Sequence, residues 1–452
     1  MPRWTLRASS LATLAMLSMG GCAAEGPAVD MNALAERYVK LVLAVGQHDP
    51  AYVDAYYGPP DWQETARSGK QPLAELDGAA ARLLEELAAL RGSGGSGGSG
   101  GEGLSDEGEL IALRHQYLER QLTSMRARIS MLSGKTLSFD EESRLLYDAV
   151  APSHPDTYFA GTLAGLDRML PGPGALIDRY DAWRKDFVIP AAHLGAVFDA
   201  AIAECRARTL KHVELPSAER FTVEYVTNKS WSGYNWYQGE FKSLIQINTD
   251  LPIYIDRAID LACHEGYPGH HVYNALLEKR LVRDRGWVES SVYALFSPQS
   301  LIAEGTANYG IEVAFSNEDR LAFERDVLFP AAGLNPARVG EYYEIQGVVE
   351  RLSYAQNEAA RRYLNGEIDR QGASEWLTRL ALMSPPRAEQ RTRFMDDYRS
   401  YVINYNLGKD LVRKHVEARA GAGADAAKRW AEFVRLLGSP RLPSGLEASA
   451  AR

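Results

Sequence analysis

The sequence is poor in cysteine, in basic residues relative to acidic ones and, beyond its N-terminus, in long apolar runs. It has three cysteines in 452 residues, and its 50 lysines and arginines are outnumbered by 59 aspartates and glutamates, for a formal net charge of −9. This acidic balance argues against nucleic acid as a partner, because a phosphate backbone is bound by a basic surface. No segment after Cys22 has the roughly 20 apolar residues that a membrane-spanning helix needs. Contact with a membrane is therefore expected only through a lipid at the N-terminus.

The first 22 residues have the pattern of a bacterial lipoprotein signal peptide. A short basic region precedes Leu11–Met19, an apolar run that is too short to span a bilayer. Small residues and Cys22 follow, as in the lipobox, whose cysteine is lipidated after cleavage. A plain secretory signal cut near Ala23 or Ala24 is the alternative. The lipobox predicts a lipid-anchored domain in the bacterial cell envelope, and Ala23 after the cysteine favours the periplasmic face of the outer membrane.

The two remaining cysteines are Cys205 and Cys263. In an exported chain they could form a disulfide. However, Cys263 adjoins the candidate site described below, and one disulfide adds little to so large a core. We therefore expect both residues to be free buried thiols.

Periodicity predicts a mainly α-helical protein, a large helical metallopeptidase-like fold with one small β-sheet beside the site helix. Amphipathic helical patterns recur from Met31 onward, whereas Phe221–Val226 and Phe241–Asn248 are β-prone. A Gly/Ser-rich segment over 92–103 is expected to form an exposed loop between antiparallel helices. The expected organisation is a signal peptide over 1–22, a tether over 23–30, a helical region over 31–215, a catalytic metal-binding region over 216–437 and a disordered tail over 438–452.

The segment His264–His271, with the sequence His-Glu-Gly-Tyr-Pro-Gly-His-His, is typical of a metal site. Zinc in hydrolases takes three protein ligands and keeps one position for water. The usual helical arrangement has two histidines one turn apart, but here Pro268 occupies that position. A break at Pro268–Gly269 is therefore needed to bring His270 beside His264 as the second ligand. His271 is the alternative, although it would lie about 10 Å along an ideal helix.

Glu265, next to the first candidate ligand, is the candidate general base. It would take a proton from metal-activated water and deliver it to the leaving amine. An isolated His-Glu pair more often belongs to a solvated helix face. The concentration of three histidines, a glutamate and a Pro-Gly break within eight residues favours the metal site.

Glu304 is the candidate third ligand, because it follows the apolar run Leu301–Ala303, where an unpaired carboxylate would be costly to bury. A surface position on an amphipathic helix is the alternative. Asn308, one turn further on, could hydrogen-bond a metal-bound imidazole. Glu312 is expected in a salt bridge or in solvent. Asp260 could support the site or be an ordinary helix-surface acid.

The sequence signals for substrate-binding residues are weaker than those for the metal ligands. A peptide substrate could bind as an added strand along Ser243–Asn248, if this segment is an exposed sheet edge rather than a merely structural strand. Nearby aromatic residues could line a pocket or pack in the core, namely Trp231, Tyr234, Trp236 and Tyr237. An oxyanion donor is also needed. Three tyrosines on one helical stripe are candidates, although such stripes are more often core, namely Tyr398, Tyr401 and Tyr405.

These motifs resemble the bacterial family called domain of unknown function 885, a group of gluzincin-like metallopeptidases. The shared marks, between residues 243 and 410, are His264-Glu265-x-x-Pro268-Gly269-His270, Glu304-Gly305 and Tyr405-x-x-Gly408. Thr306 stands where the family usually has tryptophan. The resemblance implies a helical metallopeptidase fold and one zinc ion bound by His264, His270 and Glu304. It also favours Tyr405 as the oxyanion donor.

The sequence thus predicts a zinc-dependent metallohydrolase, with a peptidase favoured. A metal-dependent hydrolase of a non-peptide amide or ester is one alternative. A catalytically inactive, envelope-binding lipoprotein is another, although the intact Glu265 counts against it. Nothing in the sequence indicates the oligomeric state.

Overall fold

The structure is a computed structural model that describes residues 30–93 and 106–450. The predicted signal peptide, Cys22 and all but the last residue of the tether lie outside the described residues, as does most of the Gly/Ser-rich segment. Within the described ranges, no helix is both long enough and apolar enough to cross a membrane.

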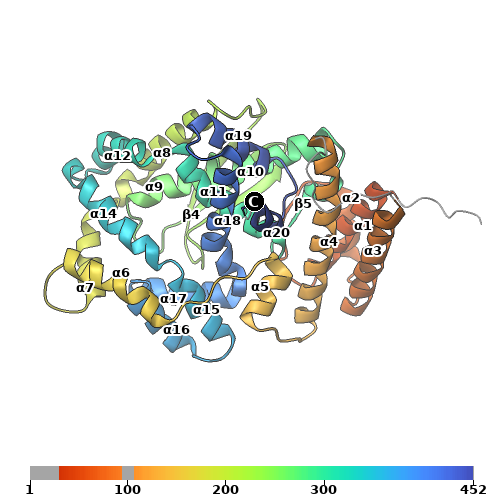
Figure 1. Ribbon diagram of the computed structural model, residues 1–452, viewed down its shortest axis with the longest axis horizontal. Coiled ribbons are helices and arrows are strands. Elements are labelled where there is room, and N and C mark those ends of the chain that lie inside the picture. Colours follow the sequence, from red (N-terminus) through yellow and green to blue (C-terminus); the bar gives the residue numbers. More distant parts are fainter. Residues whose placement is uncertain (1–29, 94–105, 451–452) are drawn as a thin grey trace, which may run out of the picture.

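Helices form most of the molecule, as predicted (Figure 1). The N-terminal region, at the right of the view, contains α1 (Met31–Val45), α2 (Pro60–Ser68), α3 (Leu73–Ser93), α4 (Asp106–Leu132) and α5 (Phe139–Tyr147). Helices α3 and α4 pack against each other on either side of the Gly/Ser-rich segment. The chain continues through α6 (Asp156–Met169), α7 (Leu176–Arg184) and α8 (Leu194–Thr209).

The later helices include those that line the candidate site. They are α9 (Asp256–Leu261), α10 (His270–Leu277), α11 (Pro298–Ala314), α12 (Asn317–Phe323), α13 (Phe329–Ala332), α14 (Val339–Val349), α15 (Ala355–Leu364), α16 (Arg370–Leu380), α17 (Pro385–Tyr398), α18 (Ile403–Ala420), α19 (Ala426–Leu437) and α20 (Pro443–Ala450). Helices α11 and α18 pack together near the middle of the molecule (Figure 1). This central pair carries several of the predicted site residues.

A three-stranded sheet lies beside the site helix, as predicted. It has the order β2 (Arg220–Val226), β4 (Lys242–Asn248), β3 (Gly233–Gly239), with β4 parallel to β2 and antiparallel to β3. The predicted edge at Ser243–Asn248 is therefore wrong, because β4 is the central strand and has neighbours on both sides. The aromatic segment Gly233–Gly239 forms an edge strand, β3.

A second, two-stranded sheet joins the two halves of the chain. Strand β1 (Val53–Tyr56) pairs antiparallel with β5 (Val292–Ala294). One hydrophobic core extends from Leu34 in α1 to Leu446 in α20. The regions 31–215 and 216–437 therefore share a core.

The predicted disordered tail is wrong for residues 438–450. Leu442 and Leu446 are 3% and 0% exposed, and α20 packs against α18. Pro443 suits the first turn of a helix, and the two leucines lie one turn apart on one face. The Ser/Pro/Gly-rich composition of this segment predicts a loop, but part of the segment forms a short helix that packs against α18.

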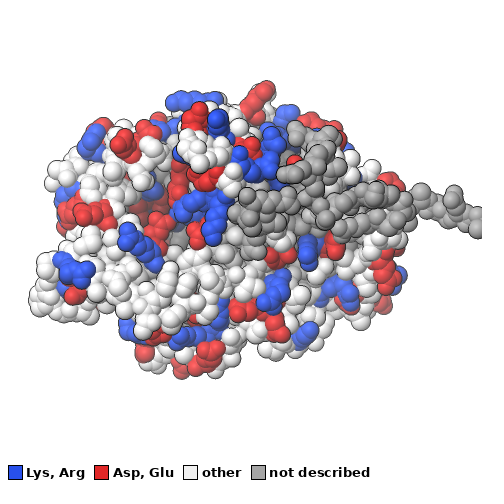
Figure 2. Space-filling view, in the orientation of Figure 1, with Lys and Arg blue, Asp and Glu red and all other residues white. Residues whose placement is uncertain are grey.

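Acidic and basic side chains are interspersed on the face shown in Figure 2. Charged side chains among the described residues form ion pairs across neighbouring helices, such as Arg37 with Glu86 and Arg126 with Asp77. Exposed pairs of this kind contribute little to stability individually, typically less than about 1 kcal/mol.

Candidate metal centre

The helix that carries His264 ends where the sequence requires it to end. Helix α9 continues into a π-helical turn, η3 (Ala262–Gly266), and the chain then passes through a cis Tyr267–Pro268 bond before α10 begins at His270. The amide of Gly269 donates to the carbonyl of Cys263 at 2.9 Å. A Cβ atom at Gly269 would lie 1.8 Å from the carbonyl oxygen of His264, so only glycine fits there. This turn brings the start of α10 beside the end of the preceding helix.

The structure brings His264, His270 and Glu304 together. The Nε2 atoms of the two histidines are 3.1 Å apart. Glu304 Oε2 lies 3.2 Å from Nε2 of His264 and 3.7 Å from Nε2 of His270. Three side chains from η3, α10 and α11 thus direct one donor atom each toward a common point.

These separations fit a small divalent cation. Two donors about 2.0–2.1 Å from one tetrahedral zinc ion are about 3.3 Å apart, close to the distances between these three atoms. Glu304 Oε1 accepts a hydrogen bond from the Tyr401 hydroxyl at 2.8 Å, whereas the buried Oε2 atom has no hydrogen-bond partner among the described residues. Two imidazoles and a carboxylate are a typical zinc donor set.

The electrostatics of the cluster favour an ionised Glu304. Burial raises the pKa of this carboxyl, but the adjacent imidazoles of His264 and His270 outweigh it and hold the pKa well below its usual range. Burial lowers the pKa of His270, yet the adjacent Glu304 raises it overall to about 9. Glu304 therefore offers a negative charge to whatever cation occupies the point between the three side chains.

Asn308 orients the first histidine, as predicted. Its Oδ1 atom lies 3.1 Å from Nδ1 of His264, and its Nδ2 atom donates to the carbonyl of Tyr405 at 3.2 Å. Because Nδ1 of His264 donates to Asn308, Nε2 is left without a proton and can bind a metal.

We expect Asn308→Ala to weaken zinc binding by about 10–100-fold, the usual effect of removing a group that orients a ligand. Competition with a chelator of known affinity would measure it. Asn308→Asp, which retains the acceptor, should bind zinc more tightly than the alanine variant. Equal affinities for all three proteins would contradict the orienting role.

Glu265 lies beside the cluster. One of its carboxylate oxygens and the donor atoms of His264 and His270 all lie within 4.8 Å of one another. The side chain is only 4% exposed, and burial raises the pKa of its carboxyl despite the opposing charges of the two histidines. Asn235 in β3 donates to the Glu265 carbonyl at 2.7 Å. This position suits a base next to a metal ion rather than a further ligand.

The crossing of α11 and α18 positions the tyrosines. A Cβ atom on Gly305 would lie 2.5 Å from the carbonyl oxygen of Gly408, so the two helix backbones are in direct contact. This contact places Tyr401 against Glu304 and leaves Tyr405 lining the cleft. The Tyr405 hydroxyl forms no hydrogen bond to a described residue, and burial raises its pKa well above the usual value, so it stays protonated. Thr306, whose hydroxyl donates to the Ala303 carbonyl, is fully buried.

The remaining candidates have structural contacts. His271 is buried, and its ring nitrogens contact Ser243 Oγ at 2.9 Å and Glu219 Oε2 at 3.1 Å, away from the cluster. Glu312 forms ion pairs with Lys409 and Arg413, as expected.

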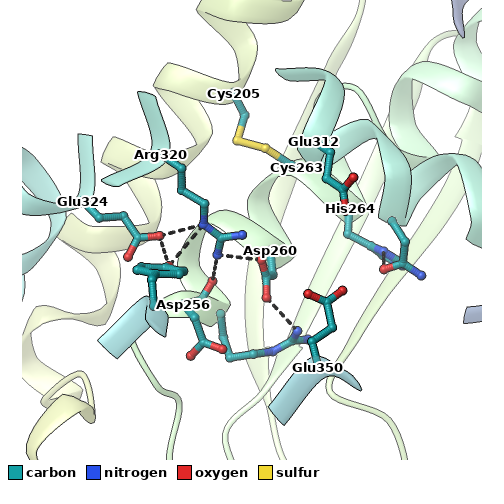
Figure 3. A network of polar contacts seen from close by, with 12 residues as sticks. Cys205, Asp256, Asp260, Cys263, His264, Glu312, Arg320, Glu324 and Glu350 are labelled. Carbon is teal, nitrogen blue, oxygen red and sulfur yellow. Dashed lines mark hydrogen bonds and ion pairs between the residues drawn. A yellow bond between two sulfur atoms is a disulfide. The ribbon is translucent and has the colours of Figure 1, made fainter. Parts of the chain in front are cut away.

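Asp260 belongs to a partly buried ion network around α9 (Figure 3). Arg320 in α12 donates to Asp260 at 2.9 Å, to Glu324 at 3.1 Å and to the carbonyl of Asp256 at 3.2 Å. Asp260 also accepts from Arg257 at 3.3 Å. Arg320 thereby joins α12 to both ends of α9, the helix that precedes His264. Asp260 thus supports the site helix without contacting a candidate ligand.

Cys205 and Cys263 form a disulfide, so the prediction of free thiols is wrong (Figure 3). Helix α8 packs against η3, and the two Cα atoms lie 5.6 Å apart, within the range that a disulfide spans. The bond ties the residue before His264 to a helix 58 positions earlier in the chain. The local sequence around either cysteine does not indicate that Cys205 and Cys263 lie close together in the fold.

We expect Cys205→Ser to lower the free energy of unfolding by up to about 4 kcal/mol, the loop-entropy estimate for a cross-link of this length. Urea unfolding would measure the loss. A reducing agent should destabilise the wild type in the same way but leave the variant unchanged. A reductant effect of equal size on both proteins would contradict a disulfide at this position.

A cleft of about 1670 Å³ contains the cluster. Trp231 and Tyr234 line it, whereas Trp236 is 38% exposed and Tyr237 is buried, with its hydroxyl donating to Glu278 at 2.5 Å. The predicted aromatic group is therefore divided between cleft, surface and core.

Three cleft residues have no motif that sequence analysis could have used. Asp54, in β1, accepts a hydrogen bond from Tyr234; burial is the main reason why its pKa is raised to about 6. Arg387 and Arg391, in α17, also line the cleft. Each reaches the site from an element remote in sequence, so only the folded chain reveals its position.

No protein-family model matches the sequence, and no curated protein matches it. Solved structures with a similar course of the chain include a "putative lipoprotein" from Colwellia psychrerythraea, at 15% sequence identity and a TM-score of 0.48, covering 84% of this chain and 69% of that one. Another, from Shewanella oneidensis, is described as "of unknown function" (14% identity, TM-score 0.41, 87% and 75% covered). A third is described as "BsuCP Crystal Structure" (10% identity, TM-score 0.45, 93% and 90% covered). Function must therefore be inferred from the site itself.

Proposed function

We propose that this chain is a zinc-dependent hydrolase that cleaves peptide bonds. His264, His270 and Glu304 would hold one zinc ion, and Glu265 would act as general base. The observation that carries the proposal is the convergence of three donor atoms, 3.1–3.7 Å apart, on a point that includes the unpartnered Oε2 of Glu304. We also propose membership of the domain of unknown function 885 family. The Gly305–Gly408 contact supports this, because it gives a packing reason for two of the shared glycines.

The chemistry follows from the residues around the cluster. A bound zinc ion lowers the pKa of water toward about 7 and withdraws electron density from a carbonyl oxygen. Glu265 accepts a proton from the attacking water and passes it to the leaving amine. The free hydroxyl of Tyr405 is available to donate to the oxyanion that develops on the attacked carbonyl. No residue of this set is required to form a covalent bond to the substrate.

The strand available for peptide binding differs from the one considered in the sequence analysis. Strand β3 is the sheet edge at the cleft, since Gly233, Tyr234 and Asn235 line it. We propose that a peptide substrate lies alongside this strand. We further propose that Cys22 anchors the protein by lipid in the bacterial cell envelope. The disulfide supports an oxidising compartment outside the cytoplasm.

Elemental analysis followed by mass spectrometry of a peptide mixture, incubated with and without chelator, tests the proposed function. The expected result is about one zinc per chain and cleavage that chelator abolishes and added zinc restores. Zinc without cleavage of any peptide would contradict peptidase activity. A panel of esters and non-peptide amides would then separate the alternative hydrolase from a binding protein.

A further inference from the structure

The cleft contains two cationic side chains without an acidic partner. Arg387 and Arg391 lie one turn apart in α17, on the same face of the helix, and both line the cleft that holds the candidate zinc ligands. Arg387 Nη1 donates only to neutral acceptors, Ser232 Oγ at 3.2 Å and Gln390 Oε1 at 3.0 Å. Neither arginine forms an ion pair with any described residue.

Arg391 is the more isolated of the two. It forms no hydrogen bond within the described part of the chain, and its Nε atom is buried without a partner. Its guanidinium group lies over the rings of Phe394, at 4.5 Å, and Tyr405, at 5.3 Å. Aromatic faces stabilise the cation but leave its in-plane N–H donors free.

The surroundings of Arg387 add positive charge, whereas the charge of Glu304 acts in the opposite sense on Arg391. Burial and the nearby Arg257 and Arg184 lower the pKa of Arg387 to about 10, and burial also lowers the pKa of Arg391. Leaving buried cations uncompensated is costly. This chain has 59 acidic residues, and other buried arginines, such as Arg114 with Glu289, are paired with one of them. Arg280 also lacks an ion pair to any described residue, but it donates to the Val434 carbonyl and does not line the cleft, whereas Arg387 and Arg391 both do. Their position points toward an anion that arrives with the substrate.

Each arginine contacts a residue that is next to, or hydrogen-bonded to, the surroundings of the candidate zinc ligands. Arg391 contacts the ring of Tyr405, whose carbonyl accepts a hydrogen bond from Asn308, the partner of His264. Arg387 contacts Ser232, and a Cβ atom on the next residue, Gly233, would lie 2.7 Å from Glu265 Oε1. An anion held by this pair would therefore lie close to the bond being cleaved.

We infer that Arg387 and Arg391 bind the C-terminal carboxylate of a peptide substrate, so that this chain removes residues from free C-termini. The inference rests on the proposed function and names its substrate class. Arginine suits this role because its planar N–H groups match the two oxygens of a carboxylate. A carboxylate would satisfy the unpartnered donors and neutralise the charge of the pair.

The test compares one peptide as its free acid and as its C-terminal amide, with the zinc-loaded protein. The free acid should have a kcat/KM about 100-fold higher, since a site built for a charged group discriminates strongly against its neutral analogue. Arg391→Ala should lower kcat/KM for the acid far more than kcat/KM for the amide, so that the ratio of the two falls to near one. Arg391→Lys, which retains the charge but not the planar group, should recover part of the difference.

Arg393→Ala is the matched control. Arg393 lies on the same helix, but it is exposed and paired with Glu389. This variant should retain the wild-type ratio of acid to amide rates. Equal thermal unfolding of the two alanine variants would exclude misfolding as the reason for a lost preference.

A binding measurement separates failure of this inference from failure of the proposed function. In the zinc-loaded Glu265→Gln variant, calorimetry should detect tighter binding of the acid than of the amide, and Arg391→Ala in that background should remove the difference. Hydrolysis of acid and amide at equal rates would overturn the carboxylate site and leave the peptidase intact. A preference for internal Asp or Glu over a free terminus would assign the arginines to side chains and overturn the C-terminal assignment. If no peptide is hydrolysed, the proposed function fails, and equal binding of acid and amide would overturn the carboxylate site as well.

Discussion

Replacing Glu265 by glutamine should lower kcat for a cleavable peptide by about 10²–10⁴-fold while the protein still binds one zinc ion. This loss corresponds to about 3–5 kcal/mol of barrier height. Glutamine preserves the shape of a side chain that is only 4% exposed, but its amide cannot accept the proton of the attacking water. Steady-state kinetics on a peptide found in the mixture assay, with zinc content measured on the same sample, would test this expectation.

Two further measurements on the Glu265→Gln variant would show that the loss of activity is due to proton transfer. The variant should have an unchanged zinc content, since the proposed ligands are His264, His270 and Glu304 and the proposed role of Glu265 is that of the base. Its unfolding temperature should also be close to that of the wild type. Near-normal turnover in this variant would refute Glu265 as the base, whatever the metal content.

Replacing Glu304 by alanine should weaken zinc binding by more than about 100-fold, because even groups that only orient a ligand contribute 10–100-fold. Glu304 Oε2 lies within 3.7 Å of both histidine donors, and it is the one carboxylate oxygen of this cluster that is buried without a hydrogen-bond partner among the described residues. Two imidazoles alone would leave the ion without its negatively charged ligand. Zinc content after dialysis against a weak chelator would measure the loss, and we expect His264→Ala to have the same effect.

Glu312→Ala is the control for this experiment, because Glu312 lies two turns further along α11 and pairs with Lys409 and Arg413. It should retain zinc at the wild-type level. Chelator should lower the unfolding temperature of the wild type and of the control, since a ligand that binds only the folded state stabilises it. The Glu304 variant should show no such shift. Wild-type zinc affinity in the Glu304 variant would contradict the proposed ligand set.

Local sequence carried most of the information about the site helix. Pro268 and Gly269 exclude a continuous helix at their positions, and the structure has the break there, with α10 starting at His270. Glu304 was identifiable because a carboxylate within an apolar run needs a partner. Asn308 followed from helical spacing alone, and its contact with His264 is confirmed.

Predictions that depended on how elements pack were the ones that failed. The edge assignment for Ser243–Asn248 was wrong because β2 adds to the far side of β4 in a parallel arrangement, which no local pattern specifies. The thiol assignment was wrong because α8 brings Cys205 next to η3. The disordered tail was wrong because burial of Leu442 and Leu446 against the core outweighs a composition typical of loops.

The sequence alone determined the class of the fold, the break after the first histidine and which side chains are candidates for binding a cation. These properties follow from backbone chemistry and residue type within one or two helical turns. Only the tertiary structure decided which strand forms the edge, which cysteines pair, and that Asp54, Arg387 and Arg391 face the same cleft as His264. Each of these depends on contacts between segments that are tens to hundreds of residues apart, and such contacts arise from the packing of whole elements around one core.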